Sequence, residues 1–272
     1  MARASSYLHN SLQHRTAITQ LVQDCGLGDA SIVVRSPSEG FSLVDLAGER
    51  YIYPASMIKT PMAIVLAREV AAGSRRLDDE VVVAAENLTP NDAPSPFIAG
   101  YRARLGELGR AMLTFSDNVA TNVLIDVLGR EALTAACHGL RLSHTAVHRK
   151  LSGNLPLIDD PQASGRNSHP AGDAARAFEL IAADARGALG WVYEALRAQH
   201  FNGKLSRGWD ASDTFAHKTG DTDEVSHDGG ILTLADGRSF IVVVYTQAES
   251  DPQTDAAFAD FARGLRPLLA AF

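Results

Sequence analysis

The chain has 272 residues, of which 46% are hydrophobic, a composition typical of a globular protein with one large domain or two closely packed ones. Its 25 basic and 32 acidic residues give a net charge of −7, with no basic block that could follow a phosphate backbone, so the sequence indicates no nucleic-acid partner. It has no uninterrupted apolar run of about 18 residues and no apolar signal-peptide core, so we expect no membrane partner and a cytoplasmic location as written, or export if a leader is missing.

The first part of the chain is predicted to form a helix and then two strands. Apolar residues recur at helical spacing over 7–24, and glycines end this pattern. Runs rich in β-formers follow at 30–34 and 41–46, and a turn-rich segment at 36–40 separates them. The two runs are therefore predicted to pair as a hairpin.

The middle of the chain is predicted to be helical and the end to return to strands. Segments with helical periodicity lie at 61–72, 101–113, 119–128, 173–185 and 188–199. Strand patterns follow at 214–218, 230–234 and 240–245, then a final helix at about 253–270. The last two strands are joined by Ala235-Asp236-Gly237-Arg238, whose Asp-Gly pair is a strong hairpin signal.

These elements predict an α/β (α+β) fold. Strands from both ends of the chain pair in one antiparallel sheet, terminal helices flank it, and an all-α region is inserted between the strands. We expect a discontinuous sheet region at 1–58 and 206–272 and a helical region at 59–205. The stretch 152–167 contains Gly, Pro, Asp and Asn without periodicity, so it is predicted to be a long surface loop of the kind that often carries function.

Ser56 and Lys59 form the first candidate site, where a strand-like run meets a helical one. Residues three apart share a helix face, so the Lys59 amine could accept the proton of the Ser56 hydroxyl. Free backbone N–H groups at the helix start could stabilise a developing oxyanion. The simpler interpretation is that Ser56 only caps the helix.

Two further polar motifs lie far along the chain. Phe115-Ser116-Asp117-Asn118 separates two helical segments, where helix capping alone would account for Ser, Asp and Asn. His217-Lys218-Thr219-Gly220 ends a predicted strand and could be an ordinary strand end and turn. Each motif is common when it occurs alone.

Together and in this order, the three motifs resemble those of class A β-lactamases and penicillin-binding proteins. The alternation of sheet, helical block and sheet is also similar to the architecture of that family. The resemblance implies a serine hydrolase that forms an acyl-enzyme at Ser56 and hydrolyses the ring amide of a β-lactam. The alternatives are a penicillin-binding or DD-peptidase-like enzyme, an esterase-like hydrolase, or a binder of β-lactam-like ligands without turnover. The implied partner is therefore a small molecule: a β-lactam, an ester or a peptide-like amide.

The resemblance also implies catalytic roles. Ser56 is the nucleophile, Lys59 accepts its proton and Ser116 relays the proton to the leaving nitrogen. Lys218, as a second nearby cation, would favour the uncharged form of Lys59. The backbone N–H groups of Ser56 and Asp221 would form the oxyanion hole.

Substrate-binding roles follow from the same resemblance. Asn118 would orient the substrate amide, and Lys218 with Thr219 and Gly220 would hold the substrate carboxylate. An inward-pointing Asp221 side chain would repel such an anion, and the sequence does not indicate its orientation. No cofactor is implied.

The sequence departs from class A β-lactamases in the loop before Asn167. Those enzymes have a glutamate there that directs water onto the acyl-enzyme, whereas this chain has no glutamate between Glu131 and Glu179. Asp159 and Asp160 are close in sequence but have shorter side chains. We therefore expect one of two outcomes. Either deacylation is slow, as in penicillin-binding proteins, or the true substrate is an ester or amide other than a β-lactam and Lys59 or His169 activates the water.

The remaining polar signals are given simpler interpretations. His144 and His148 could share a helix face but have no third ligand at a recognisable spacing, so we expect a surface pair and no metal site. His227-Asp228-Gly229-Gly230 is predicted to be a hairpin turn. Cys25 and Cys137 are expected to be thiols. Oligomeric state is not predicted.

Overall fold

The computed structural model describes residues 14–37 and 41–272 of the chain. Of the predicted N-terminal helix, residues 14–24 are helical, and 7–13 lie outside the described residues. The main sheet contains β1 (Ser31–Ser36), β2 (Phe41–Leu46), β5 (Thr214–Asp221), β6 (Ser226–Thr233) and β7 (Ser239–Thr246). The strands run in the order β2-β1-β7-β6-β5 and every neighbouring pair is antiparallel. The predicted mixed fold with one antiparallel sheet built from both ends of the chain is confirmed.

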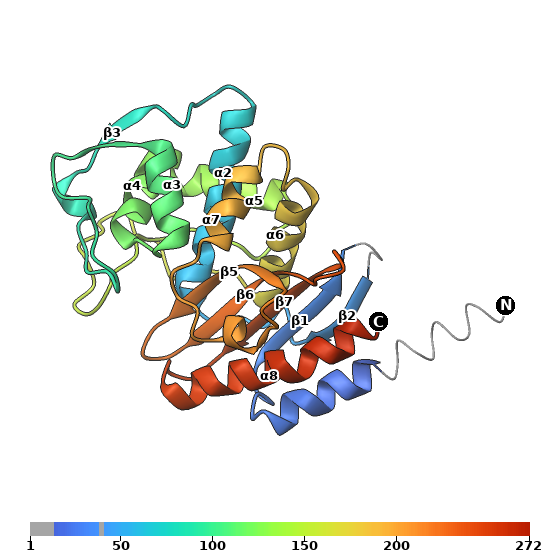
Figure 1. The fold of residues 1–272 in the computed structure, drawn as a ribbon. Coiled ribbons are helices and arrows are strands. Elements are labelled where there is room, and N and C mark those ends of the chain that lie inside the picture. The colour runs from blue at the N-terminus through green and yellow to red at the C-terminus, as the bar shows by residue number, and fades with distance from the viewer. Residues whose placement is uncertain (1–13, 38–40) are drawn as a thin grey trace.

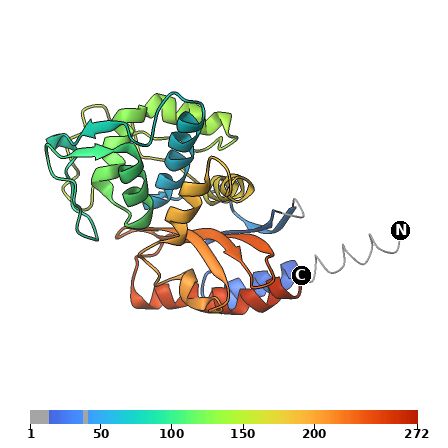
Figure 2. The same cartoon turned by 45° about the horizontal axis from the view of Figure 1, so that its top comes forward.

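Helices cover both faces of this sheet (Figure 1). The last helix, α8 (Pro252–Ala270), and the helical residues 14–24 lie side by side on one face, and the remaining helices lie on the other side (Figures 1 and 2). Those helices are α2 (Lys59–Ala71), α3 (Leu105–Thr114), α4 (Asn118–Leu128), α5 (Arg130–Gly139), α6 (Ala171–Ala183) and α7 (Gly190–Arg197). Short 3-10 turns are η1 (Ala55–Ile58), η2 (Ala85–Asn87) and η3 (Leu205–Gly208). None of the described helices is long and apolar enough to cross a bilayer.

The strand sequences explain the two cores. β7 is buried along almost its whole length, as an apolar run in the middle of a doubly covered sheet must be. On β1 the side chains alternate, so that Ile32 and Val34 pack towards α8 while Val33 packs towards the helical region. The sheet is therefore held between two apolar layers.

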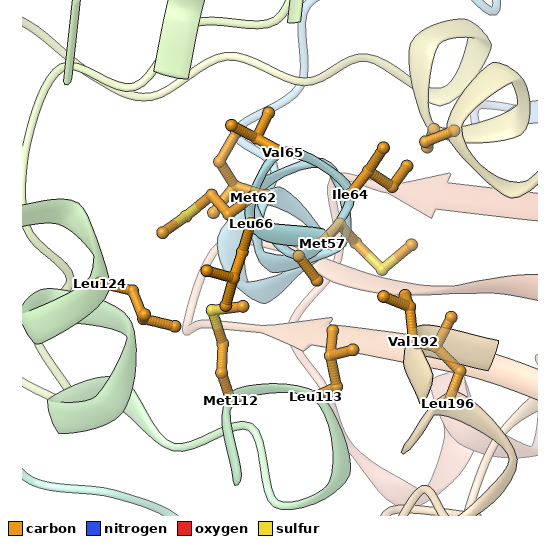
Figure 3. Close-up of a cluster of buried hydrophobic side chains, with 14 of the residues drawn as sticks. Met57, Met62, Ile64, Val65, Leu66, Met112, Leu113, Leu124, Val192 and Leu196 are labelled. Atoms are coloured by element: carbon orange, nitrogen blue, oxygen red, sulfur yellow. The ribbon is translucent and has the colours of Figure 1, made fainter. Parts of the chain in front are cut away.

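Helix α2 is the centre of the helical region and begins at the candidate site. Its residues from Lys59 to Ala67 are all buried, as expected for a helix that is apolar around most of its circumference. Figure 3 shows its side chains, among them Met62 and Leu66, surrounded by Met112, Leu124 and other apolar groups from neighbouring helices. Lys59 thus lies on the buried first part of a helix that other helices surround.

The structure corrects several predicted boundaries. The helix predicted at 101–113 begins at Leu105, because 102–104 form β4 (Arg102–Arg104), which pairs with β3 (Glu80–Val82) in a separate small sheet. Helix α5 was not predicted; it follows α4 directly after Gly129, whose φ of 79° separates the two helices. The predicted turn at 227–230 is wrong, because these residues lie within strand β6.

The glycines of that segment explain why it is a strand. A Cβ on Gly230 would lie 2.3 Å from the Ala216 carbonyl O, and one on Gly229 would lie 3.0 Å from Val243 Cγ2. The two glycines allow β5 and β7 to approach β6 closely on either side. Cys25 and Cys137 are free thiols, as expected.

Candidate active site

Ser56 lies at the start of the helical region, on the wall of a cleft of about 720 Å³. Asn118 and Asp221 line the same cleft. The preceding residue, Ala55, has a φ of 46°, a left-handed conformation that residues with a Cβ rarely adopt and that is often found at functional sites. The chain therefore turns sharply where it presents Ser56 to the cleft.

Lys59 lies one turn further on and is completely buried. Its Nζ donates to the Ser116 carbonyl O at 2.6 Å, to Ser116 Oγ at 3.0 Å and to Asn118 Oδ1 at 2.7 Å. Burial, and then the charge of Lys218, lower the pKa of Lys59 well below its ordinary value, against the opposing effect of Asp117. The site favours the neutral amine.

In the segment between α3 and α4, one residue caps a helix and its two neighbours contact Lys59. Asp117 caps α4, because its Oδ1 accepts the backbone N–H of Ala120 at 2.8 Å. Ser116 has a φ of 55° and, with Asn118, turns towards Lys59. Capping therefore accounts for Asp117 but not for Ser116 and Asn118.

Lys218 approaches the same hydroxyl from strand β5. Its Nζ donates to Ser116 Oγ and to the Thr219 carbonyl O, each at 2.9 Å. Burial lowers the pKa of Lys218 to about 7, although Asp221 and Asp228 act in the opposite direction. Two amines and a hydroxyl in hydrogen-bond contact form a path along which a proton can move.

The β5 edge is also in contact with the backbone of the Ser56 segment. A Cβ at Gly220 would lie 3.0 Å from the Pro54 carbonyl O and 3.1 Å from Ser56 N. A side chain at this position would push the two segments apart. Thr219 is buried, and the Asp221 carboxylate pairs with the Lys204 amine.

The predicted loop forms another wall of the cleft, together with the residues just before it. Residues 149–155, 157 and 166 contribute, and Leu155 and Leu157 are 74% and 51% exposed. Among the described residues, the carboxylates that line the cleft are Asp92, Asp221, Asp223 and Glu224, and none of these belongs to the loop. The loop thus lines the cleft with apolar, polar and basic residues but with no carboxylate.

The alternative water-activating groups of the loop do not reach the cleft. Asp160 pairs with Arg130 at 2.6 Å, and its other oxygen accepts the backbone N–H of Lys150 at 2.7 Å. Asp159 is exposed and is not part of the cleft wall. His169 is fully buried, contacts Thr145 Oγ1 at 2.8 Å, and burial lowers its pKa to about 3. His169 is not among the residues that line the cleft, and its role as a base for water stays a prediction.

Sequence reasoning missed two residues that support the site. Asn122 on α4 accepts the Leu151 N–H at 2.7 Å and donates to the Leu151 carbonyl at 2.9 Å, which ties the loop to the helix. Asn91 Oδ1 accepts the backbone N–H of Asn118. An asparagine in the apolar run of α4 was a usable signal, because a buried amide needs partners; Asn91 carried no such signal.

The chain matches a known protein family over most of its length. Residues 13–267 match the β-lactamase enzyme family. No curated protein sequence matches the chain significantly.

Solved structures share the fold at low identity. A β-lactamase from Sphaerobacter thermophilus is 23% identical, with a TM-score of 0.76 over 92% of this chain and 95% of that one. PBP-A is 21% identical, with a TM-score of 0.82 over 94% and 97%. An ancestral class A β-lactamase is 22% identical, with a TM-score of 0.80 over 94% and 100%. The match over nearly the whole chain, on a fold shared with these structures, shows that the chain belongs to the β-lactamase enzyme family of hydrolases.

Proposed function

We propose that this protein is a serine hydrolase that forms an acyl-enzyme at Ser56 and opens the ring amide of β-lactams. The observation that carries the proposal is the position of the Ser116 hydroxyl, in contact with the Lys59 and Lys218 amines next to the cleft that Ser56 lines. Burying an amine costs free energy unless a charged partner compensates it. Two buried lysines at one serine hydroxyl therefore indicate a function and not a purely structural contact.

Acylation requires a neutral amine beside the nucleophile. Ser56 Oγ attacks the carbonyl carbon while its proton passes to Lys59, and the oxyanion binds the N–H groups of Ser56 and Asp221. The carbon–nitrogen bond then breaks, and the proton reaches the leaving nitrogen through Ser116. The product is an ester of Ser56, and water later hydrolyses this ester to release the acid and restore the hydroxyl.

The contacts of Lys59 are consistent with this role. A neutral amine has two N–H donors and one lone pair. The carbonyl of Ser116 and Oδ1 of Asn118 can only accept, so they take both donors of the neutral amine and leave its lone pair open to accept the Ser56 proton. After acylation the protonated Lys59 donates to Ser116 Oγ, as Lys218 also does, and Ser116 can pass its own proton to the leaving nitrogen.

Substrate binding uses the edge of strand β5. In its protonated form, Lys218 provides a buried positive charge for a substrate carboxylate, with Thr219 beside it and Gly220 leaving space for the Ser56 backbone. Asn118, at the cleft wall, can hydrogen bond to the substrate amide. β-Lactams combine an activated amide with a carboxylate and so match both features.

Deacylation is proposed to be slow. The loop beside Ser56 presents Leu155 and Leu157 and contributes no carboxylate to the cleft wall, so no loop group is available to deprotonate the hydrolytic water. A long-lived acyl-enzyme is the behaviour of penicillin-binding proteins. A variant of PBP-A with glutamate in place of a leucine has been solved as an acyl-enzyme complex with penicillin G, and it shares this fold at 22% identity with a TM-score of 0.81.

The test is incubation with a chromogenic cephalosporin, followed over time by absorbance and intact-protein mass spectrometry. We expect one burst of product and a persistent adduct on wild-type protein and on the Cys137→Ala control, and no adduct on Ser56→Ala. Fast steady turnover without an adduct would refute slow deacylation. An adduct that forms equally on Ser56→Ala would refute the assignment of the nucleophile.

A further inference from the structure

A third buried lysine, Lys204, lies behind the β5 edge, just before η3. It is 3% exposed, and its Nζ donates to Asp221 Oδ1 and, at 3.2 Å, to the carbonyl O of His227. Lys204 Nζ also lies over the ring of Phe258, 5.6 Å from its centroid. No step of the proposed reaction uses this amine.

Asp221 is the carboxylate that is left to pair with Lys204. Asp228, another nearby acid, is already occupied, since Oδ1 lies 2.8 Å from His217 Nδ1 and Oδ2 accepts the backbone N–H of Leu205. Asp221 lines the cleft and is only partly exposed. Its charge therefore lies at the wall where a substrate carboxylate would bind.

Lys204 is also connected to the Ser56 segment through β6. Its second acceptor belongs to His227, which pairs across the strands with Gly220. The ring of His227 donates through Nε2 to the carbonyl O of Tyr53 at 2.8 Å, three residues before Ser56. One amine thus contacts the end of β5 and the strand that supports the nucleophile segment.

We propose that Lys204 is a positioning residue that neutralises Asp221 and holds its carboxylate away from the anion site at Lys218, so that the cleft accepts substrates with a carboxylate. This inference rests on the proposed function. Without Lys204, the Asp221 carboxylate would lie uncompensated beside the β5 edge, where it repels an anionic substrate and competes for the charge of Lys218. A neutral substrate does not experience this repulsion.

The test compares acylation rates for two substrates, a penicillin with its carboxylate and an uncharged activated ester. Lys204→Met is expected to slow acylation by the penicillin by about tenfold or more, and acylation by the ester much less. Lys204→Arg keeps the charge and should retain most of the penicillin rate. The double variant Lys204→Met with Asp221→Asn removes both charges and should recover the preference for the penicillin.

Lys204→Gln is the second neutral variant, since its amide can still donate to both oxygens if the methionine variant fails to fold. It should show the same selective loss with the penicillin. An equal loss with both substrates, or no recovery when Asp221→Asn is added, would show that Lys204 only supports the fold and would overturn the inference. A wild-type protein that neither substrate acylates would instead refute the proposed function.

Discussion

The Nζ atoms of Lys59 and Lys218 lie 3.0 and 2.9 Å from the same oxygen, Ser116 Oγ. Both amines are buried, so two positive charges at this hydroxyl would repel each other without water to screen them. Burial and the charge of Lys218 lower the pKa of Lys59, and burial lowers that of Lys218, so the site disfavours the state in which both amines are charged. The proposed reaction separates their roles, with Lys59 as the neutral base and Lys218 as the cation.

This separation predicts a pH profile that depends on the substrate. Burial lowers the pKa of Lys218 to about 7, so kcat/KM for a penicillin should fall as pH rises through that region and Lys218 loses its charge. An uncharged ester should lack this falling limb. Lys218→Arg should remove the limb for the penicillin, because arginine remains protonated. A penicillin profile that still rises at pH 9 would contradict the assigned role of Lys218.

Two buried histidines predict a loss of stability in acid. Burial lowers the pKa of His169 to about 3 and that of His227 to about 4, so between these values and pH 6.5 the unfolded chain binds protons that the folded chain does not. The free energy of unfolding should therefore fall as pH drops below 6.5, by up to about 1.4 kcal/mol per pH unit for each histidine.

Urea unfolding at pH 6.5 and 5 measures this dependence for wild type and for His169→Gln. The variant should be less stable at both pH values but should lose less stability between them. An identical pH dependence in the two proteins would rule out His169 as one of the titrating groups.

Introducing a carboxylate at Leu155 should accelerate deacylation. Leu155 is 74% exposed and lines the cleft with Ser56, so a glutamate is accommodated without loss of core packing and places a base for water next to the acyl group. General base catalysis contributes about a hundredfold or more when the geometry is good, and we expect at least a tenfold faster decay of the adduct. Leu155→Gln is the matched control; equal decay in the two variants would show that the carboxylate does not reach the water.

The ion pair between Arg130 and Asp160 is predicted to hold the loop in place. Both side chains are largely buried, so Arg130→Ala leaves an unpaired carboxylate and should lower the free energy of unfolding by about 3 kcal/mol. Loop 152–167 should also be cleaved faster by a protease. Arg102→Ala breaks the exposed pair with Glu80 and should change stability by less than about 1 kcal/mol. Similar melting temperatures for the two variants would contradict this role of the loop pair.

Much of this architecture could be predicted from the sequence where local patterns coincide with tertiary contacts. The hairpin at 235–238 and the apolar strand β7 follow from turn chemistry and from the length of the apolar run. The three polar motifs could be recognised because Ser56, Ser116 and Lys218 occur in the order typical of the family. The structure brings Ser116 and Lys218 into contact. Their catalytic roles remain predictions.

The features that were missed depend on tertiary contacts. The Asp-Gly pair in β6 indicates a turn locally, yet close packing against β5 and β7 makes it a strand. Strands β3 and β4 have three residues each, too few for an alternating pattern to be recognised. Lys204 lies in a short polar segment and gives no signal, because its partner Asp221 is identified only by the fold.

The position of β7 between β1 and β6 has a consequence for synthesis on the ribosome. The hairpin of β1 and β2 is translated before the helical region, and its inner edge has no strand to pair with until β7, which begins at Ser239, has been translated. Long-range pairing of this kind delays completion of the sheet and leaves an open strand edge in the nascent chain. A truncated translation product that ends before residue 239 would therefore contain every reactive side chain and still lack the scaffold that brings them together.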